Sequence, residues 1–296
     1  MSPKKRTILL FGRSGSGKST QIGVMAEWVY NKTGLPTRLY TADRGGLDPM
    51  MPHIEAGIIE VVEMGNTDPF IFLNKACKGE VRDATGKWIQ STTPIGMYAF
   101  ESMRSFAEAL MAVMTSKVAA GQNIGGSANI NFAVSDGVEN LKISGSNMAM
   151  FGVTQARITE EVWASQRLDA PYILWTSSIS KDDDQVSAGK ILGPEVIGKA
   201  LTGEVPRWFQ LSFRIDQRPA QAGQPEKHIL FLGSSVDALA GNATVLGNLR
   251  LPIDAPPIPA TLEPASLPKA IELIDDAFSK SADKLKLRMS TAAKKV

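Results

Sequence analysis

The apolar positions in the first part of the chain alternate between strand-like runs and helix-like spacing. Mostly apolar runs at Thr7–Leu10, Thr37–Ala42 and Gly57–Met64 predict strands. Between the first two runs, Thr20–Lys32 carries apolar residues three and four positions apart, and a Gly-Leu-Pro sequence follows shortly afterwards. That spacing predicts a helix with one buried face, which the glycine and the proline end. Alternating strands and helices predict a parallel sheet covered by helices.

The same alternation continues to about residue 250. The further elements predicted are helices over Pro69–Lys78 and Val153–Leu168, core strands over Ile95–Ser102 and Pro171–Ser178, and edge strands over Lys227–Leu232 and Ala243–Leu246. An amphipathic segment after the Ile95–Ser102 run predicts one more helix. We therefore predict an α/β fold with a mostly parallel, twisted sheet and helices on both of its faces.

Two stretches interrupt this pattern. Residues 121–152 are rich in Gly, Ser and Asn, with space for a hairpin, which predicts a flexible insertion. Residues 251–259 are rich in proline, which predicts a connector that is neither helix nor central strand. Helical spacing resumes over Leu267–Met289, and basic residues follow. We predict a core domain over residues 1–250 and a linker with a basic C-terminal helix and tail over residues 251–296.

Composition and charge narrow the class of protein. The chain is 43% hydrophobic and 21% charged, as in ordinary globular proteins, and its formal net charge is +2. The net charge is too small to indicate binding to nucleic acid by itself. The basic residues near the two ends are compatible with a solvated tail and with a binding patch. One cysteine and two histidines are too few for a disulfide framework or a zinc site. Without an apolar run of about 18 residues or an N-terminal signal sequence, we expect a cytoplasmic protein with no membrane partner.

A phosphate-binding loop follows the first predicted strand. The stretch from Gly12 to Thr20 matches the pattern G-x-x-x-x-G-K-[ST] at every fixed position and precedes the first predicted helix. Glycines let successive backbone N–H groups point at one anion, and the helix adds its positive N-terminal end. The nucleotide-binding residues predicted are Gly12, Ser14, Gly15, Ser16, Gly17, Lys18, Ser19 and Thr20. Lys18 should reach the β- and γ-phosphates, and the Ser19 hydroxyl should ligate Mg²⁺. The alternative is a glycine-rich turn that matches by chance.

Two acids follow predicted core strands. Asp43 comes just after the second strand, so it faces the nucleotide if that strand neighbours the first, and it could then orient or deprotonate the attacking water. Glu101 ends the Ile95–Ser102 run, as a Walker B acid that holds the water shell of Mg²⁺ beside Ser19 must do. The alternatives are an ordinary turn for Asp43 and a buried strand that ends in an acid for Glu101.

These segments resemble RecA-like P-loop ATPases. The stretch 42–49, an acid followed by Leu-Asp-Pro, is similar to the segment in which recombinases place a water-activating Glu, although this chain has Asp. Glu101-Ser102 resembles the Asp-Ser that ends their Walker B strand. The resemblance spans about residues 6–250 and implies a RecA-like P-loop NTPase fold that acts as a homo-oligomer. Residues 193–214 resemble the corresponding segment of phage-encoded recombination and single-strand annealing ATPases. If the protein is phage-encoded, this resemblance implies that it acts in the cytoplasm of the host cell.

The same resemblance implies further candidates. Lys199 could complete a neighbour's active site as a trans-acting cation, although a surface lysine at a helix end is the simpler reading. Thr176 and Ser177 stand where P-loop ATPases sense the γ-phosphate, or they are turn residues. The 121–152 insertion could face single-stranded DNA, but it lacks a basic cluster, which favours a surface insertion.

The sequence thus favours an ATPase that uses ATP and Mg²⁺, with Lys18, Asp43, Glu101 and Lys199 as catalytic candidates and Ser19 and Glu101 as metal candidates. The lack of an Asn-Lys-x-Asp guanine motif tilts the nucleotide towards ATP. We expect the activity to be coupled to single-stranded DNA in recombination, annealing or related phage DNA metabolism. The alternatives are a DNA-packaging or assembly module that binds nucleotide, and a small-molecule P-loop kinase, against which the chain shows no arginine-rich lid segment.

Overall fold

The computed structural model describes residues 5–119, 130–135, 140–145, 150–183, 190–197, 201–218, 227–237, 243–245 and 247–293 of the 296-residue chain. Among these residues, no helix is both long enough and apolar enough to cross a membrane.

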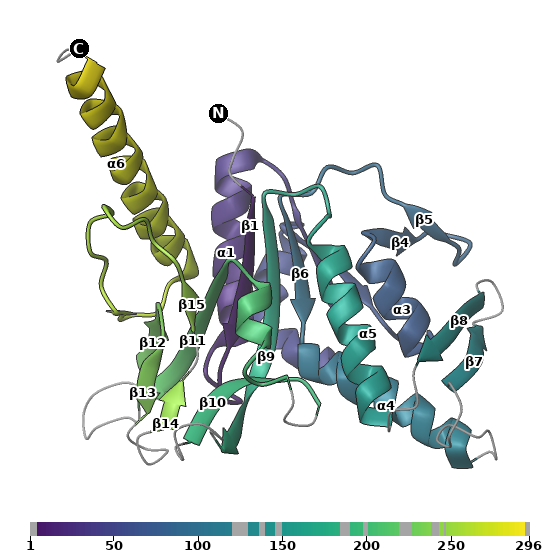
Figure 1. Ribbon diagram of the computed structural model, residues 1–296. Helices are drawn as coiled ribbons and strands as arrows, with labels where there is room; N and C mark the ends of the chain where they lie inside the picture. The colour runs from purple at the N-terminus through teal and green to yellow at the C-terminus, as the bar shows by residue number, and fades with distance from the viewer. Residues whose placement is uncertain are drawn as a thin grey trace.

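A twisted sheet forms the centre of the molecule, and six of its strands form one parallel block (Figure 1). Their spatial order is β3-β2-β6-β9-β1-β11. The bounds are β1 (Arg6–Phe11), β2 (Thr37–Thr41), β3 (Ile59–Glu63), β6 (Met97–Glu101), β9 (Tyr172–Asp183) and β11 (Leu211–Arg218). All-parallel pairing makes the carboxyl ends of these strands meet at one edge of the sheet, where ligands gather in such folds.

Shorter strands extend the sheet beyond this parallel block. They are β10 (Lys190–Glu195), β12 (Lys227–Phe231), β13 (Ser235–Asp237), β14 (Ala243–Val245), β15 (Asn248–Leu249) and β16 (Thr261–Leu262). The strands that we predicted as edges, β12 and β14, each have a neighbour on both sides. β16 pairs with β12 and β13 pairs with β14, so these two strands lie one position inside the edges. The two-residue and three-residue strands that cover them are too short to be recognised from alternation.

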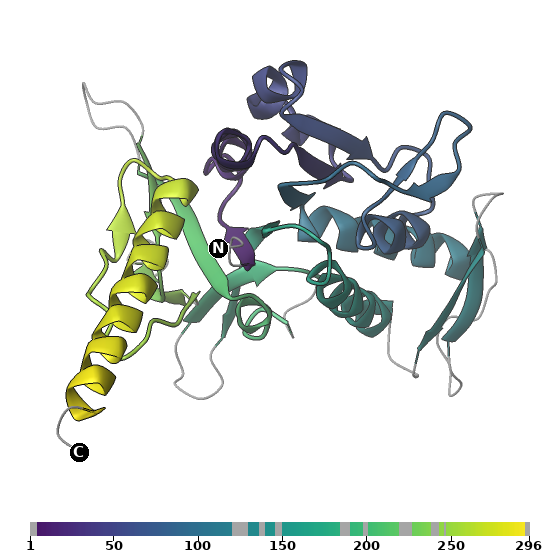
Figure 2. The ribbon, with the colours of Figure 1, turned by 90° about the horizontal axis from the view of Figure 1, so that it is seen from above.

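Helices cover both faces of the sheet, as the sequence predicted. One face packs against α1 (Lys18–Thr33) and α6 (Leu267–Ala293), and the other packs against α3 (Pro69–Ala76), α4 (Met103–Ala119) and α5 (Met150–Ser165), which the view from above in Figure 2 separates. The remaining elements are α2 (Met51–Glu55), single 3-10 turns at Arg44–Gly46, Asp48–Met50 and Val205–Trp208, and the hairpins β4 (Glu80–Arg82) with β5 (Trp88–Gln90) and β7 (Ile130–Ser135) with β8 (Asn140–Gly145). The mixed α/β fold is therefore the one predicted, and the hairpin expected within residues 121–152 is present.

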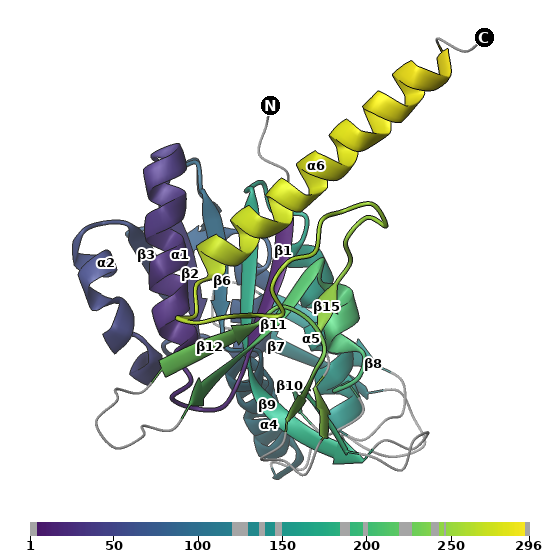
Figure 3. The ribbon, with the colours of Figure 1, turned by 90° about the vertical axis from the view of Figure 1, so that its left-hand side faces the viewer.

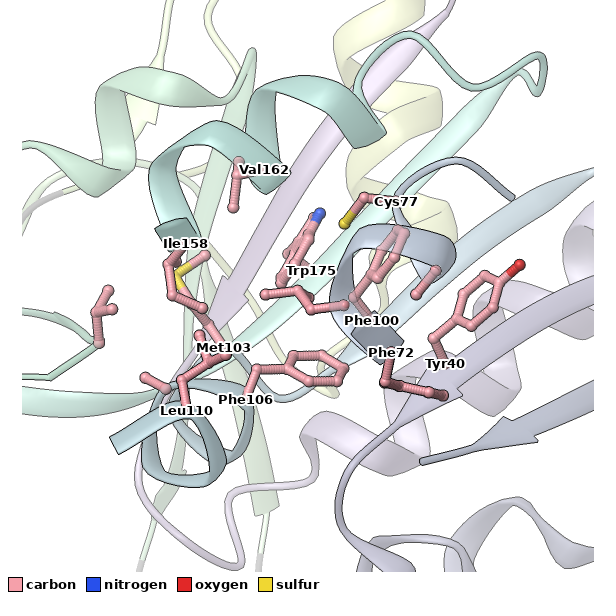
Figure 4. Packing of buried hydrophobic residues seen from close by; sticks show 14 of the residues in the cluster. Tyr40, Phe72, Cys77, Phe100, Met103, Phe106, Leu110, Ile158, Val162 and Trp175 are labelled. Carbon is pink, nitrogen blue, oxygen red and sulfur yellow. The ribbon is translucent and has the colours of Figure 1, made fainter. Parts of the chain in front are cut away.

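An aromatic cluster fills the face under α3, α4 and α5 (Figure 4). The rings of Phe100 and Trp175 stack with their centroids 4.4 Å apart, Tyr40 stacks on Phe100 at 5.5 Å, and Phe106 meets Trp175 edge-on at 5.9 Å. The Trp175 indole N–H donates to Ser165 Oγ at 3.0 Å, so the one polar atom of that ring is satisfied. This packing holds β6 and β9 in place directly behind the predicted nucleotide site.

The C-terminal helix α6 divides into a packed half and a projecting half (Figure 3). Ile271 and Ile274 are fully buried in the same core as α1, and Gln21 of α1 bonds both to the carbonyl of Ala265 and to the N–H of Leu267. Beyond this, the helix extends away from the body, with Leu287 68% exposed. It continues four residues past the predicted end at 289 because neither glycine nor proline interrupts it. The first half of α6, which we assigned outside the core domain, therefore packs against the core.

Candidate functional site

The phosphate-binding loop has the backbone that its glycines predict. β1 ends at Phe11, and α1 begins at Lys18 with Gly17 as its N-cap at a φ of 93°. Gly15 also has a positive φ, of 75°. A Cβ on Gly12 would lie 2.1 Å from the carbonyl oxygen of Ile215, so no larger residue fits there. These three glycines place the first turn of α1, with its unbonded N–H groups, at the carboxyl end of β1.

A cavity of about 550 Å³ lies in front of this loop. It brings together six of the eight predicted nucleotide-binding residues with both predicted acids. Its lining consists of Ser14, Gly15, Gly17, Lys18, Ser19, Thr20, Asp43, Gly45, Gly46, Pro49, Glu101, Ser102, Arg104, Ser105, Glu108 and Ser178. The other two predicted residues, Gly12 and Ser16, lie beneath the loop, where both are buried and shape it from behind.

Lys18 is held against its own loop. Its ammonium donates to the carbonyl oxygens of Gly12 at 3.0 Å and Arg13 at 2.8 Å. Burial lowers the pKa of Lys18, and the nearby Glu101 carboxylate opposes that shift. These hydrogen bonds to neutral carbonyl groups hold the positive charge of Lys18 at the mouth of the loop. An anion that binds there can take the place of the two carbonyl groups as the partner of Lys18.

Glu101 and Ser19 meet at the floor of the cavity. The Ser19 hydroxyl donates to Glu101 Oε1 at 2.5 Å, whereas Glu101 Oε2 is buried with no hydrogen-bond partner among the described residues. Glu101 is only 6% exposed, and this burial raises its pKa to about 7, against the opposing effects of the Ser19 hydrogen bond and the Lys18 charge. An orphaned buried carboxylate oxygen is costly, and a cation with its water shell would satisfy it.

A metal at this point would depend on few protein ligands. Within the part of the chain that the structure describes, no group of three His, Cys, Asp or Glu side chains could hold a metal ion. Mg²⁺ in nucleotide sites is bound by one or two protein oxygens, and its other ligands are waters and phosphate oxygens. The pair formed by Ser19 and Glu101 fits Mg²⁺ of that kind, and it does not fit a cation that needs a complete protein cage.

Asp43 reaches the cavity although β2 is not next to β1. β6 and β9 separate the two strands, so the neighbouring position on which we based the prediction is wrong. The carboxylate lines the cavity because β2 pairs with β6, whose last residue is Glu101. Asp43 is exposed, its Oδ1 accepts the Gly45 N–H at 2.9 Å, and its charge contributes to the raised pKa of Glu101.

The candidate γ-phosphate sensors are not among the residues that line the cavity. The Thr176 hydroxyl is buried 3.4 Å from the carbonyl of Phe100, and the Ser177 hydroxyl donates to the carbonyl of Glu195 at 2.5 Å. Ser178, one residue further along β9, lines the cavity instead. The strand was predicted, but the residue of β9 that lines the cavity lies one position beyond the two that we named. Lys199 lies outside the described residues.

Two site residues escaped the sequence analysis. Arg104, 44% exposed in the first turn of α4, lines the cavity and pairs with Glu108 and Glu195, each at 2.7 Å. His228 of β12 contacts the loop from behind, with Nδ1 2.9 Å from the carbonyl of Ser16. Since a carbonyl only accepts, Nδ1 carries the proton in this contact. The position of Arg104 three residues after Glu101 was a usable signal, because the helix after a Walker B strand starts at the site, whereas nothing in the sequence linked His228 to the loop.

Comparisons with known proteins complete the description. No protein-family model matches the sequence, and no curated protein matches it. Among solved structures, a KaiC-like protein from the hyperthermophilic archaeon Pyrococcus horikoshii OT3 is similar, with a TM-score of 0.39 and 11% identity over 82% of this chain and 90% of that one. The flagellar accessory protein FlaH from Methanocaldococcus jannaschii is similar with a TM-score of 0.37 and 10% identity, over 78% of each chain.

Proposed function

We propose that the protein is a Mg²⁺-dependent, RecA-like ATPase whose hydrolysis is coupled to DNA. The observation that carries the hydrolysis half is the convergence of Lys18, Ser19, Asp43 and Glu101 on one cavity at the start of α1. An ammonium, a hydroxyl and two carboxylates in front of a helix N-terminus provide what phosphoryl transfer needs, namely positioning and charge neutralisation.

ATP would bind with its phosphates on the loop. The N–H groups between Gly15 and Ser19 and the Lys18 ammonium would hold the β- and γ-phosphates, so that Lys18 exchanges its two carbonyl partners for phosphate oxygens. Ser19 and, through water, Glu101 would hold Mg²⁺, which when bound neutralises charge on the phosphate oxygens. Binding of the cation gives Glu101 Oε2 the partner that it lacks among the described residues.

Hydrolysis would then depend on the placement of one water molecule. Asp43 would orient this water and accept its proton while the water oxygen bonds to the γ-phosphorus. The bond from that phosphorus to the β–γ bridging oxygen breaks, and ADP and inorganic phosphate leave. Because Asp43 is exposed, its carboxyl group can return the proton to solvent. Arg104 at the same cavity would add a second cation for the charge that develops on the phosphoryl group.

The DNA half of the proposal rests on the sequence resemblance. Residues 193–214 resemble phage-encoded recombination and annealing ATPases, and RecA-like proteins place DNA-contacting loops after core strands comparable to the one that precedes the 121–152 insertion. The same resemblance makes the active form a homo-oligomer in which Lys199 of one subunit completes the site of the next.

The test is release of phosphate from ATP and Mg²⁺, with and without single-stranded DNA. We expect DNA to stimulate release, and Lys18→Ala to lower kcat/KM by at least about 100-fold, because it removes a charge that contacts the reacting phosphates. Lys87→Ala, an exposed lysine on the β4–β5 turn, is the matched control and should leave the rate unchanged. Release that ignores DNA would remove the DNA half and leave the ATPase.

Asp43→Asn tests the role of the water-orienting acid. We expect unchanged binding of ATP and a turnover at least about tenfold lower, because an amide cannot accept the proton of the water. Wild-type turnover in this variant would remove Asp43 from the mechanism. Phosphate transfer that needs a small-molecule acceptor would instead indicate a kinase, and tight binding of ATP without turnover would indicate an assembly module.

A further inference from the structure

A second cavity lies at the opposite edge of the sheet from the phosphate-binding loop. Its volume is about 510 Å³, and it opens beside the amino-terminal ends of β1 and β11. None of its lining residues belongs to the candidate ATP site. The lining consists of Lys5, Arg6, Thr7, Gln166, Arg207, Trp208, Phe209, Gln210, Leu211, Asn248, Arg250 and Phe278. Neither the phosphate-binding loop nor the acids at the carboxyl edge explain why this second cavity exists.

The charged residues that line this second cavity are all basic, and acids outside the lining lie beside three of them, with Asp169 near Lys5. Four of its lining residues are cationic, namely Lys5, Arg6, Arg207 and Arg250, and none of the lining residues is acidic. Arg6 pairs with Asp275, and Arg207 pairs with Glu204 at 3.1 Å, both partners lying outside the lining. Arg250 is exposed and has no ion pair among the described residues. A concave site lined by cations concentrates anions, and guanidinium groups bind phosphate through paired N–H donors.

Aromatic surface stands beside these cations. Trp208 and Phe278 both line the cavity, and both are half-buried. The guanidinium of Arg6 lies 5.2 Å from the centroid of the Phe278 ring, which ties the packed half of α6 to this wall. In proteins that bind single-stranded nucleic acid, bases of any sequence stack on aromatic rings that lie in a positively charged groove.

The walls of the second cavity are fixed before any ligand arrives. The Gln166 amide donates to the carbonyl of Trp208 at 2.7 Å, and the Asn248 amide donates to the carbonyl of Phe209 at 2.6 Å. The N–H of Gln210 donates to Thr7 Oγ1 at 3.0 Å. Arg6 is 4% exposed and holds its place through Asp275. Cavities of about this volume and rigidity are typical of small-ligand sites.

We propose that the second cavity binds one nucleotide unit, with its phosphate on Arg207 and Arg250 and its base on Trp208. The unit can come from a free nucleotide or from a position within a single strand of DNA, and both present the same phosphate and aromatic base. The proposal does not depend on ATP hydrolysis at the phosphate-binding loop, because the two cavities share no residue.

The test uses Lys18→Ala protein, in which binding at the phosphate-binding loop is weakened. Calorimetric titrations with AMP and with a six-residue oligothymidylate distinguish the two sources. We expect at least one of these probes to bind, and Arg207→Gln with Arg250→Gln to weaken that binding at least about tenfold. Both arginines are exposed, so the double variant should fold, which its melting temperature checks. The matched control, Lys87→Gln with Lys269→Gln, removes the same charge elsewhere on the surface and should change binding less than twofold.

Trp208 gives a second and independent readout. We expect Trp208→Leu to weaken binding by about 5-fold to 100-fold, the range measured for loss of a stacked base, and Trp208→Phe to restore most of it. For the oligothymidylate, loss of the two arginines should also lower the dependence of binding on salt by about one unit of log–log slope. Binding of neither probe by the Lys18→Ala protein would overturn the proposal, and so would equal losses in the arginine variant and the lysine control.

Discussion

The cavity at the phosphate-binding loop and the basic cavity lie at opposite edges of the same sheet and differ in how they are built. The cavity at the carboxyl edge is lined largely by loop backbone and by small or acidic side chains, and its cations, Lys18 and Arg104, share the lining with the acids Asp43, Glu101 and Glu108. The cavity at the amino edge has no acid in its lining and is walled by arginines and aromatic rings. Their volumes are similar, about 550 and 510 Å³, so size does not distinguish them.

This difference follows from the direction of the strands. At the carboxyl edge, a helix begins directly after a strand, so unbonded N–H groups and glycines can surround a phosphate chain. At the amino edge, no helix N-terminus follows a core strand, and recognition has to come from side chains. The carboxyl-edge cavity suits a ligand whose reacting phosphates need a metal, whereas the amino-edge cavity suits a ligand that is only bound.

The largest effect should come from Glu101→Gln, which acts at the carboxyl edge alone. We expect hydrolysis to fall by at least about 100-fold, because the amide holds the water shell of Mg²⁺ more weakly than a carboxylate. In the wild type, the affinity for Mg²⁺ should fall up to about tenfold per pH unit below pH 7, because the raised pKa of Glu101 lets a proton compete with the metal. That pH dependence should disappear in Glu101→Gln. Binding of AMP at the amino edge should not change in the variant, and a parallel loss there would break the separation of the two sites.

The ionisation of Glu101 should also make the stability of the fold depend on pH. The folded-state pKa of Glu101 is raised from 4.5 to about 7, so the folded state binds this proton more tightly than the unfolded state does. Its contribution to stability is fully present below pH 4.5 and is lost as the pH rises through about 7. The difference is about 3 kcal/mol in the free energy of unfolding without ligand. Glu101→Gln should remove this dependence of stability on pH, because the amide is neutral at every pH. In urea unfolding at pH 8 the variant should therefore be more stable than the wild type. Equal stability of the two proteins would contradict the argument that burial raises the pKa of Glu101.

Gly12→Ala should have the next largest effect, because the carboxyl-edge cavity depends on backbone shape. A Cβ at this position meets the carbonyl oxygen of Ile215 at 2.1 Å, and backbone cannot move aside as a flexible side chain can. We expect a lower melting temperature and an affinity for ATP reduced at least about tenfold. Gly203→Ala is the control, since an added Cβ there has no neighbour within 4 Å, and it should behave as the wild type. Normal ATP binding by Gly12→Ala would show that the loop tolerates a side chain at this position.

The smallest effect should come from the projecting half of α6. Leu287→Gln should change the free energy of unfolding by less than about 0.5 kcal/mol, because this side chain is 68% exposed. It should leave both cavities unchanged. Ile271→Ala, in the packed half of the same helix, should cost about 2–5 kcal/mol. Comparable losses in the two variants, measured by chemical unfolding, would mean that the distal half of α6 is buried in solution, for instance against a second copy.

The residues around the carboxyl-edge cavity were more predictable from the sequence than the arrangement of strands. The loop from Gly12 to Thr20, Asp43 and Glu101 could be named in advance because glycine conformation and strand ends are local properties. The strand order could not be predicted in this way. Asp43 was expected to face the nucleotide if β2 lay next to β1, and β6 and β9 separate these two strands. Thr176 and Ser177 were named as candidates, whereas Ser178 lines the cavity, because the point at which β9 reaches the site depends on its register with β1 and β6.

The sequence by itself determined most of the longer strands and helices and the phosphate-binding loop, since these follow from spacing and from the conformations open to glycine within a few residues. Only the tertiary structure decided what lies beside that loop. Long-range pairing of β2 with β6 brought Asp43 next to Glu101, and β12 carried His228 to the back of the loop. The same long-range packing gathered Arg6, Arg207 and Phe278 around a second cavity. Such contacts join residues up to about two hundred and seventy positions apart, and no local pattern encodes which of them meet.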